Sequence, residues 1–295
     1  MPEKPPVVLS IAGFDPSCGA GVTADIKTIA AHGCYGVACI TALTVQSTAG
    51  VRKVEVLDPS FVTSTLQELA ADMDIAAIRI GMLGSGRVVK AVADFLIAQS
   101  KRAGKSSAST GAVAVGMKVV LDPILKSSSG ADLLDPAGAR LLMDLLIPLA
   151  DVVTPNVDEA AVLTGIKVRD LDDMKAAAAK LHEMGASAAV ITGGHLDKAI
   201  DLLSYIGSRG LEQEIFKAER QRSNSTHGTG CAFATAMACH LALDRGLAEA
   251  ALLAKTYVGA AISSGHPLGR GTGPVNHLYR LNLQRRAAGS GGSES

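Results

Sequence analysis

The chain has 295 residues, of which 48% are hydrophobic and only 3% aromatic, and it contains no tryptophan. This length suits one large α/β domain or two smaller ones, and the apolar content with a formal net charge of zero excludes a disordered chain. Because 28 basic residues balance 28 acidic ones, no long-range positive field exists to recruit nucleic acid.

Membrane and secretory signals are missing as well. No apolar run approaches the roughly 18 residues that cross a bilayer, and the first residues lack the pattern of a signal peptide. The five cysteines (Cys18, Cys34, Cys39, Cys231 and Cys239) include no Cys-x-x-Cys pair. They indicate reduced thiols rather than a disulfide scaffold or a zinc site. We therefore expect a cytoplasmic protein without nucleic-acid or membrane partners.

Strand-like and helix-like patterns alternate along the chain. Strands are expected at 7–12, 37–45, 51–57, 75–80, 119–121, 152–153 and 188–191, followed by a hairpin of 202–206 and 214–218. Helices are expected at 22–32, 61–71, 88–99, 136–146, 156–163, 170–184, 231–243 and 247–263, with Asp135, Asn156 and Asp170 placed as N-caps. The alternation predicts an α/β fold with a mostly parallel sheet and helices on both faces. Residues 1–286 are expected to form a single domain, 101–116 a surface loop, and 287–295 a disordered tail.

Several turn-rich segments follow the predicted strands, at 13–21, 81–83, 122–123, 154–156 and 192–195. In open α/β sheets, ligands bind at the carboxyl edge of the strands, so these turns predict a binding edge. Gly19 to Ala24 also fits a loose dinucleotide fingerprint, but 26–54 lacks the acidic residue which that fingerprint needs. A P-loop motif is absent as well, so neither nucleotide fold is favoured.

The strongest local signal is Thr226-His227-Gly228-Thr229-Gly230-Cys231, directly before an alanine-rich helix. Small residues let the backbone approach a ligand closely, and the helix start leaves N–H groups unpaired. Together they form an anion site that suits a phosphoryl group. Cys231 falls in the first turn, where the helix dipole would lower the thiol pKa. The alternative is a glycine-rich loop beside a small buried cysteine.

Asp122 and the pair Asn156 and Glu159 are further candidates. Asn156 and Glu159 are three residues apart and project from nearly the same face of a first helical turn. With Asp122 they could hold Mg²⁺ through its water ligands and keep the phosphates of ATP in place. Alternatively, Asn156 is only an N-cap and Glu159 a favourable charge near the helix start.

A series of short strings follows one another in a fixed order along the chain: Ser10-Ile11-Ala12-Gly13-Phe14-Asp15-Pro16-Ser17, Gly19-Ala20-Gly21, Ala24-Asp25-Ile26-Lys27-Thr28, Tyr35-Gly36, Ile40-Thr41-Ala42-Leu43, Gln46, Ile80-Gly81-Met82-Leu83, Thr154-Pro155-Asn156, Glu159-Ala160 and His227-Gly228-Thr229-Gly230-Cys231. Taken together, these strings resemble hydroxymethylpyrimidine/phosphomethylpyrimidine kinases over about 7–279. The resemblance implies a ribokinase-like three-layer α/β/α sandwich, with ATP and Mg²⁺ as cofactors. It implies transfer of the ATP γ-phosphate to a hydroxymethylpyrimidine and then to its monophosphate, in thiamine biosynthesis. Homodimers are common in the family.

The resemblance also assigns substrate-binding residues. Gln46 would bind the pyrimidine edge, because its amide both donates and accepts hydrogen bonds. Gly13, Asp25 and Met82 would complete the pocket. Alternatively, Met82 only fills the core and Asp25 only supports the first turn of its helix.

Catalytic and nucleotide-binding residues follow in the same way. Gly228, Thr229 and Gly230 would form the anion hole, with Cys231 where related sugar kinases carry a catalytic aspartate. Cys231 would act as a base or would orient the hydroxyl group. The nucleotide is assigned to Asn156, Thr192, Gly194 and Lys255, and the metal to Asp122 and Glu159. A solvated role for Lys255 remains an alternative.

The chain departs from the family pattern in three places. Cys18 stands where glycine is usual, Thr192 stands where lysine is common, and the loop 101–116 is longer. Thr192 weakens the expectation of a lysine on the ATP phosphates from this strand.

Other functions remain open. Pyridoxal or pyridoxine kinases share the motifs, although Gln46 and Met82 favour a pyrimidine. A non-catalytic pyrimidine-binding sensor would not need the anion hole, and a purely structural protein would not explain the aligned turns.

Overall fold

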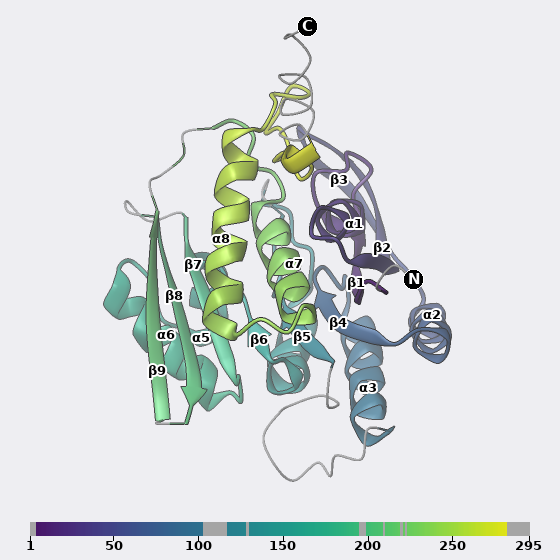
Figure 1. The fold of residues 1–295 in the computed structure, drawn as a ribbon. Coiled ribbons are helices and arrows are strands. Elements are labelled where there is room, and N and C mark those ends of the chain that lie inside the picture. The colour runs from purple at the N-terminus through teal and green to yellow at the C-terminus, as the bar shows by residue number, and fades with distance from the viewer. Residues whose placement is uncertain are drawn as a thin grey trace, which may run out of the picture.

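A computed structural model describes residues 4–102, 117–127, 130–194, 199–208, 210–218, 221 and 223–281. The described residues form a nine-stranded sheet with the order β3-β2-β1-β4-β5-β6-β7-β8-β9 (Figure 1). The strands are β1 Val7–Phe14, β2 Tyr35–Ser47, β3 Gly50–Val56, β4 Ile75–Ile80, β5 Lys118–Leu121, β6 Val152–Val153, β7 Ala188–Gly193, β8 Ala199–Gly207 and β9 Gly210–Ala218.

The central strands of the sheet are parallel, and its margins are antiparallel. Parallel pairing joins β2 to β1, β1 to β4, and then β4 through β7 in sequence. β3 pairs antiparallel with β2, and β8 and β9 form the expected antiparallel hairpin beside β7. The predicted mostly parallel sheet is therefore confirmed.

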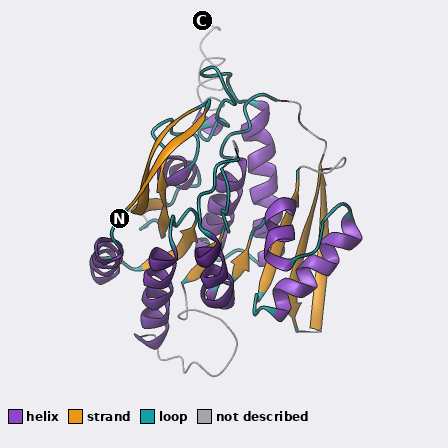
Figure 2. Cartoon of the chain, turned by 180° about the vertical axis from the view of Figure 1, so that it is seen from behind, coloured by secondary structure: helices purple, strands orange, loops and turns teal. Residues whose placement is uncertain are grey.

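Helices cover both faces of this sheet (Figures 1 and 2). Hydrophobic residues of α1, α7 and α8 pack on one face, and those of α2 to α6 pack on the other. The helices are α1 Gly21–Ala31, α2 Pro59–Asp72, α3 Gly86–Arg102, α4 Pro136–Leu141, α5 Val157–Thr164, α6 Leu171–Glu183, α7 Thr229–Ala242 and α8 Leu247–Ser263. The three layers confirm the expected α/β/α class.

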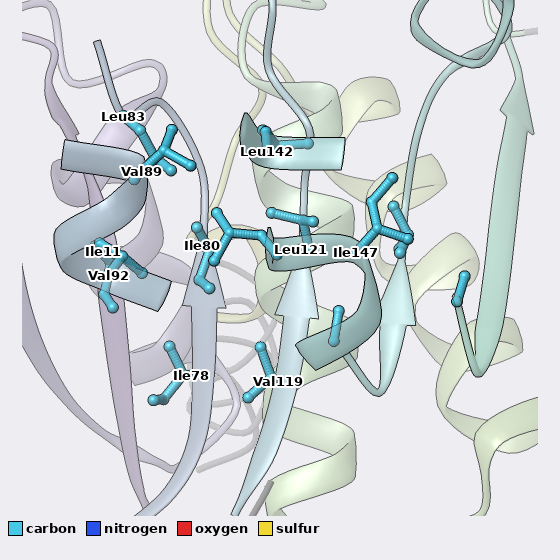
Figure 3. Packing of buried hydrophobic residues seen from close by; sticks show 14 of the residues in the cluster. Ile11, Ile78, Ile80, Leu83, Val89, Val92, Val119, Leu121, Leu142 and Ile147 are labelled. Carbon is cyan, nitrogen blue, oxygen red and sulfur yellow. The ribbon is translucent and has the colours of Figure 1, made fainter. Parts of the chain in front are cut away.

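Burial on both faces explains why the central strands are almost entirely apolar. Figure 3 shows Ile78 and Ile80 of β4 beside Val119 and Leu121 of β5, in the same apolar cluster as Val89 and Val92 of α3. Because side chains alternate along a strand, Ala77 and Arg79 of β4 lie on the opposite face, toward α7. Arg79 is therefore a charged residue in a layer of aliphatic side chains.

Most element boundaries lie within a few residues of those expected. Asp135, Asn156 and Asp170 each accept a backbone N–H as N-caps, as predicted. The helix expected at 136–146 is irregular, because α4 ends at Leu141 and continues as a π-helical turn, Leu142–Leu146, and a 3-10 turn, Ile147–Leu149. β2 extends beyond the expected range because it pairs with β3 in a hairpin up to Ser47.

Parts of the expectations fall outside the described residues. These are 103–116 of the expected surface loop, His195, and the expected tail 287–295. Within the described ranges, none of the helices has the length and apolar character needed to cross a membrane.

A buried histidine, His240, and a half-buried one, His32, lie in the layer formed by α1, α7 and α8. The rings of His32 and His240 meet edge to face with centroids 4.9 Å apart, and Tyr257 packs on His32 at 4.5 Å. His32 Nε2 and both ring nitrogens of His240 have no hydrogen-bond partner in the described part of the chain. Burial lowers the pKa of each histidine to about 4, and the nearby cations Arg245 and Arg280 act in the same direction.

These shifts predict acid destabilisation. Between pH 6.5 and about 4 the native state binds fewer protons than the unfolded state, so stability is fully present above this window and falls as the pH drops through it. Each histidine contributes at most about 3 kcal/mol. Urea unfolding from pH 7.5 to 4.5 measures the slope, which His240→Leu should reduce. His266→Leu, at an exposed histidine, should leave it unchanged. A flat wild-type profile would contradict this expectation.

Candidate active site

The carboxyl ends of the parallel strands meet at one edge of the sheet. Backbone hydrogen bonds tie each following turn to a neighbouring strand or turn. Gly81 N–H donates to Ile11 O (2.9 Å), Asp122 N–H to Ile80 O (2.8 Å), Thr154 N–H to Leu121 O (2.8 Å) and Thr192 N–H to Pro155 O (2.9 Å). Turns far apart in the sequence therefore lie side by side at this edge.

Helix α7 begins at the same edge with the glycine-rich segment. Gly228 is its N-cap with φ +82°, a conformation that favours glycine. A Cβ on Gly228 would overlap the carbonyl oxygen of Gly19, so the loop 15–21 and the start of α7 are in direct contact. A Cβ on Gly230 would meet nothing within 4 Å, which leaves open space beside this turn. The N–H groups of Gly230 and Cys231, in the first helical turn, are available to an anion there.

Asp15 locks the loop 15–21 to this segment. Its carboxylate accepts hydrogen bonds from Ser17 N (2.8 Å), Ser17 Oγ (2.7 Å), Ala20 N (2.9 Å) and His227 Nε2 (2.8 Å). Burial alone would raise the pKa of Asp15, but the hydrogen bonds from His227 and Ser17 outweigh it and lower the pKa. Cys18, where glycine was expected, adopts φ +58° in this tightly held loop.

Gln46 lies at the end of β2, facing the same segment. Its Oε1 accepts a hydrogen bond from Thr44 Oγ1 (3.2 Å), and its Nε2 lies 3.3 Å from His227 Nε2. Gln46 and His227 line a cavity of about 170 Å³ together with Thr48 and Gly271. The side chain thus presents an amide to a cavity beside the segment 226–231, the candidate anion loop.

Gly13 and Met82 lie against each other at the ends of β1 and β4. A Cβ on Gly13 would come within 2.8 Å of Met82 Sδ. Met82 is buried, and its carbonyl oxygen accepts a hydrogen bond from Thr41 Oγ1 (2.5 Å). Glycine is therefore needed here for Met82 to keep its place.

Asp25 is fully buried behind the edge. It lies beyond the first turn of α1, so the alternative that it supports that turn is wrong. Its carboxylate accepts hydrogen bonds from Ser10 Oγ (2.6 Å), Thr235 Oγ1 (2.8 Å) and Arg79 Nη1 (3.1 Å). The protein itself supplies these donors, which favours a supporting role for Asp25 over direct substrate contact.

The environment of Cys231 corrects one expectation. Burial raises the pKa of the thiol to about 11, and Asp122 and Asp25 act in the same direction, whereas Arg79 opposes them. The expectation of a thiol pKa lowered by the helix dipole is therefore wrong, because desolvation and the two carboxylates dominate. Cys231 is only 7% exposed at the base of the anion loop.

Asn156 and Glu159 form a capping box at the start of α5. Asn156 Oδ1 accepts from Asp158 N and Glu159 N (both 2.9 Å), and Glu159 Oε2 accepts from Asn156 N (3.0 Å). The predicted cap is thus confirmed. Any contact of Asn156 or Glu159 with a nucleotide or metal would be additional to this capping role.

Two acidic side chains at this edge, Asp122 and Glu159, have raised pKa values. Burial raises the pKa of Glu159 to about 8, and the nearby Asp122 adds to the shift. Burial also raises the pKa of Asp122 to about 6, although Arg79 opposes it. A divalent cation between them would relieve this repulsion. Among the described residues, no cluster of three or more His, Cys, Asp or Glu could bind a metal. Two carboxylates alone offer few ligands, so a Mg²⁺ ion here would need water and phosphate oxygens for the rest.

Lys255 of α8 lies near the end of β7. Its Nζ donates to Asp201 Oδ2 (2.6 Å), and Asp201 Oδ1 accepts from Gly193 N (3.1 Å). Asp201 pairs with Thr192 across β7 and β8. The Lys255 side chain is only 14% exposed and forms an ion pair with Asp201. The alternative that Lys255 is an ordinary solvent-exposed lysine is therefore wrong. The structure thus brings Thr192, Gly194 and Lys255 into one neighbourhood.

Sequence reasoning did not single out Asp15, Arg79 or Asp201. Arg79 carried a readable signal, because it is the one charged residue of the apolar segment 75–80. Asp15 and Asp201 carried none, since their partners His227 and Lys255 are 212 and 54 residues away in the chain.

Comparisons with known proteins agree with this geometry. A family model described as phosphomethylpyrimidine kinase matches residues 15–276. Hydroxymethylpyrimidine/phosphomethylpyrimidine kinase of Streptomyces coelicolor is 39% identical over 281 residues, 95% of this chain and 97% of the relative. The thiamine biosynthesis bifunctional protein ThiED of Geobacter sulfurreducens is 39% identical over 92% of this chain, which spans 52% of that longer protein.

Solved structures give the same picture. Phosphomethylpyrimidine kinase of Clostridium difficile is 34% identical with a TM-score of 0.72, covering 87% of this chain and 99% of its own. Pyridoxal kinase of Staphylococcus aureus, in complex with AMP-PCP and pyridoxal, is 31% identical with a TM-score of 0.77, covering 93% and 94%. Both similarities span nearly the whole fold. The chain therefore belongs to the phosphomethylpyrimidine kinase family.

Proposed function

We propose that this kinase transfers the γ-phosphate of ATP to 4-amino-5-hydroxymethyl-2-methylpyrimidine and then to the resulting monophosphate, in thiamine biosynthesis. One observation carries the proposal: the open N-terminal turn of α7 lies at the same edge as Asp122 and the Gln46 cavity. The relatives named as hydroxymethylpyrimidine/phosphomethylpyrimidine kinase and phosphomethylpyrimidine kinase support this choice of reaction. The AMP-PCP complex of a structural neighbour supports ATP as the donor, since AMP-PCP is an ATP analogue.

The residues divide between three tasks. Gln46, with Gly13 and Met82, binds the pyrimidine, and Cys231 orients the hydroxymethyl oxygen. N–H groups of the segment from Gly228 to Gly230 stabilise the negative charge that develops on the transferred phosphoryl group.

The nucleotide side uses the neighbouring strand ends. Asn156, Thr192, Gly194 and Lys255 hold ATP, and Asp122 and Glu159 bind Mg²⁺ through its water ligands. Bound Mg²⁺ reduces the charge repulsion between phosphate oxygens. The proposal places this activity in the cytoplasm, in a single domain of residues 1–286 that can form homodimers.

ADP release tests the proposal. Purified protein with Mg-ATP is offered hydroxymethylpyrimidine, its monophosphate, pyridoxine, pyridoxal and ribose separately. Turnover of both pyrimidines is expected. Gln46→Ala should raise the pyrimidine KM about 10- to 100-fold, because the ring loses two hydrogen bonds, whereas Gln213→Ala, at an exposed glutamine of β9, should not. Tight pyrimidine binding without turnover of any substrate would favour a sensor instead.

Pyridoxal kinase activity is the second candidate. It is favoured by the TM-score of 0.77 to the Staphylococcus aureus enzyme, above the 0.72 to the Clostridium difficile one. A higher kcat/KM for pyridoxal than for hydroxymethylpyrimidine in the same assay would establish it.

A further inference from the structure

Arg79 is the centre of a buried polar network below the anion loop. Its side chain is completely buried. Nη1 donates to Asp25 Oδ2 at 3.1 Å, and Nη2 donates to Asp122 Oδ2. The Cys231 thiol lies close enough for the positive charge of Arg79 to act on its pKa. One cation of β4 thus joins α1 to the turn after β5, close to the start of α7.

The backbone is built to accommodate this guanidinium. A Cβ on Gly81 would overlap Nη1 of Arg79, so the side chain occupies the space beside Gly81 at the strand end. Asp25 anchors the other side, because Ser10 and Thr235 fix its carboxylate at 2.6 and 2.8 Å. The position of the guanidinium is therefore determined from several directions.

Stability alone does not account for this arrangement. Replacing buried ion pairs by apolar side chains of similar volume is often neutral or stabilising. The neighbouring residues of β4 are aliphatic, and Nε of Arg79 has no hydrogen-bond partner within the described ranges. A charged residue in this place points to a role at the edge of the sheet.

We propose that Arg79 is a positioning residue of the phosphoryl-transfer centre. It holds the Cys231 sulfur and the Asp122 carboxylate in a fixed relation below α7, and it supplies positive charge where ATP phosphates approach the carboxylates. This inference rests on the proposed kinase function. Fixed charge and fixed geometry lower the barrier because neither has to reorganise during the reaction.

The test compares Arg79→Met, Arg79→Lys and the matched control Arg87→Met, at an exposed arginine of α3. Arg79→Met should lower kcat about 100-fold, the loss that follows from misplacing a reacting group by about 1 Å. The pyrimidine KM should stay within about threefold, since Gln46 is untouched. Arg79→Lys keeps the charge but loses the planar fork that reaches both Asp25 and Asp122, so it should recover kcat only in part, to within about 10-fold of wild type. Arg87→Met should have no effect.

A second readout does not depend on turnover. Calorimetry should show Arg79→Met binding AMP-PCP about 10-fold more weakly, with pyrimidine binding unchanged, and Arg79→Lys binding it nearly as well as wild type. If the wild-type protein turns over no substrate, the proposed function fails, and the calorimetric comparison still decides the role of Arg79.

Two results would overturn the inference. The first is a folded Arg79→Met variant whose kcat and AMP-PCP affinity are within threefold of wild type. The second is an Arg79→Lys variant whose kcat and AMP-PCP affinity have fallen as far as those of Arg79→Met.

If Arg79→Met does not fold, Asp25→Asn provides the alternative, because it removes the charged anchor of Arg79 while keeping the arginine. It should lower kcat about 10-fold at constant pyrimidine KM, and an unchanged kcat would equally overturn the inference.

Discussion

Gly228→Ala is expected to abolish nearly all turnover and to destabilise the fold. A side chain there would overlap the carbonyl oxygen of Gly19 and would also sit at φ +82°. Relief requires the loop 15–21 to move away from the start of α7, which displaces the anion hole. Since a shift of about 1 Å costs roughly 100-fold and a lost donor costs about as much again, we expect a fall in kcat of about 1,000-fold or more. Thermal unfolding should begin about 5 °C lower.

Gly165→Ala is the matched control for backbone strain. Gly165 caps the end of α5 with φ +73°, and a Cβ there meets nothing within 4 Å. The control should lose about 1–2 kcal/mol of stability and keep its kcat. Steady-state kinetics and thermal unfolding of both variants separate strain from overlap. Equal kcat values for Gly228→Ala and wild type would refute the assigned anion hole.

Cys231→Ala is expected to lower kcat about 100- to 1,000-fold with a smaller change in pyrimidine KM. The sulfur is buried in the first turn of α7, within the electrostatic reach of Arg79. Removing it leaves the substrate hydroxyl without its orienting group. Because burial raises the thiol pKa to about 11, orientation rather than proton abstraction is the expected role.

Cys231→Ser distinguishes these two roles. A serine hydroxyl still offers a polar group that can hydrogen-bond the substrate oxygen, so kcat should stay within about 10-fold of wild type if orientation suffices. Serine as inactive as alanine would show that the thiolate itself is required. Cys239→Ala, at a fully buried cysteine further along α7, is the matched control and should keep its kcat.

Much of the fold was predictable because local rules and the sheet pattern agreed. Apolar runs ending in small residues predicted the central strands, and Asp135, Asn156 and Asp170 predicted helix starts. The irregular end of α4 was not predictable, because the pattern 136–146 is equally compatible with a regular helix. The family was recognisable because its motifs lie in register along the chain, and the family model confirms it.

The candidate site was only partly predictable. The segment 226–231 could be singled out as a candidate anion loop, since glycines before a helix have a local physical meaning, and this role stays a prediction. The raised pKa of the Cys231 thiol could not be predicted, because it comes from burial and from Asp25 and Asp122, which lie more than 100 positions away in the chain.

The sequence by itself determined the alternation of strands and helices, the helix caps and the membership of a kinase family. These depend on neighbouring residues and on motif order. Only the tertiary structure decided that Asp15 binds His227, that Lys255 pairs with Asp201, and that Arg79 joins Asp25 to Asp122 near Cys231. Each of these contacts bridges distant segments, and its strength depends on burial, which no local pattern of residues specifies.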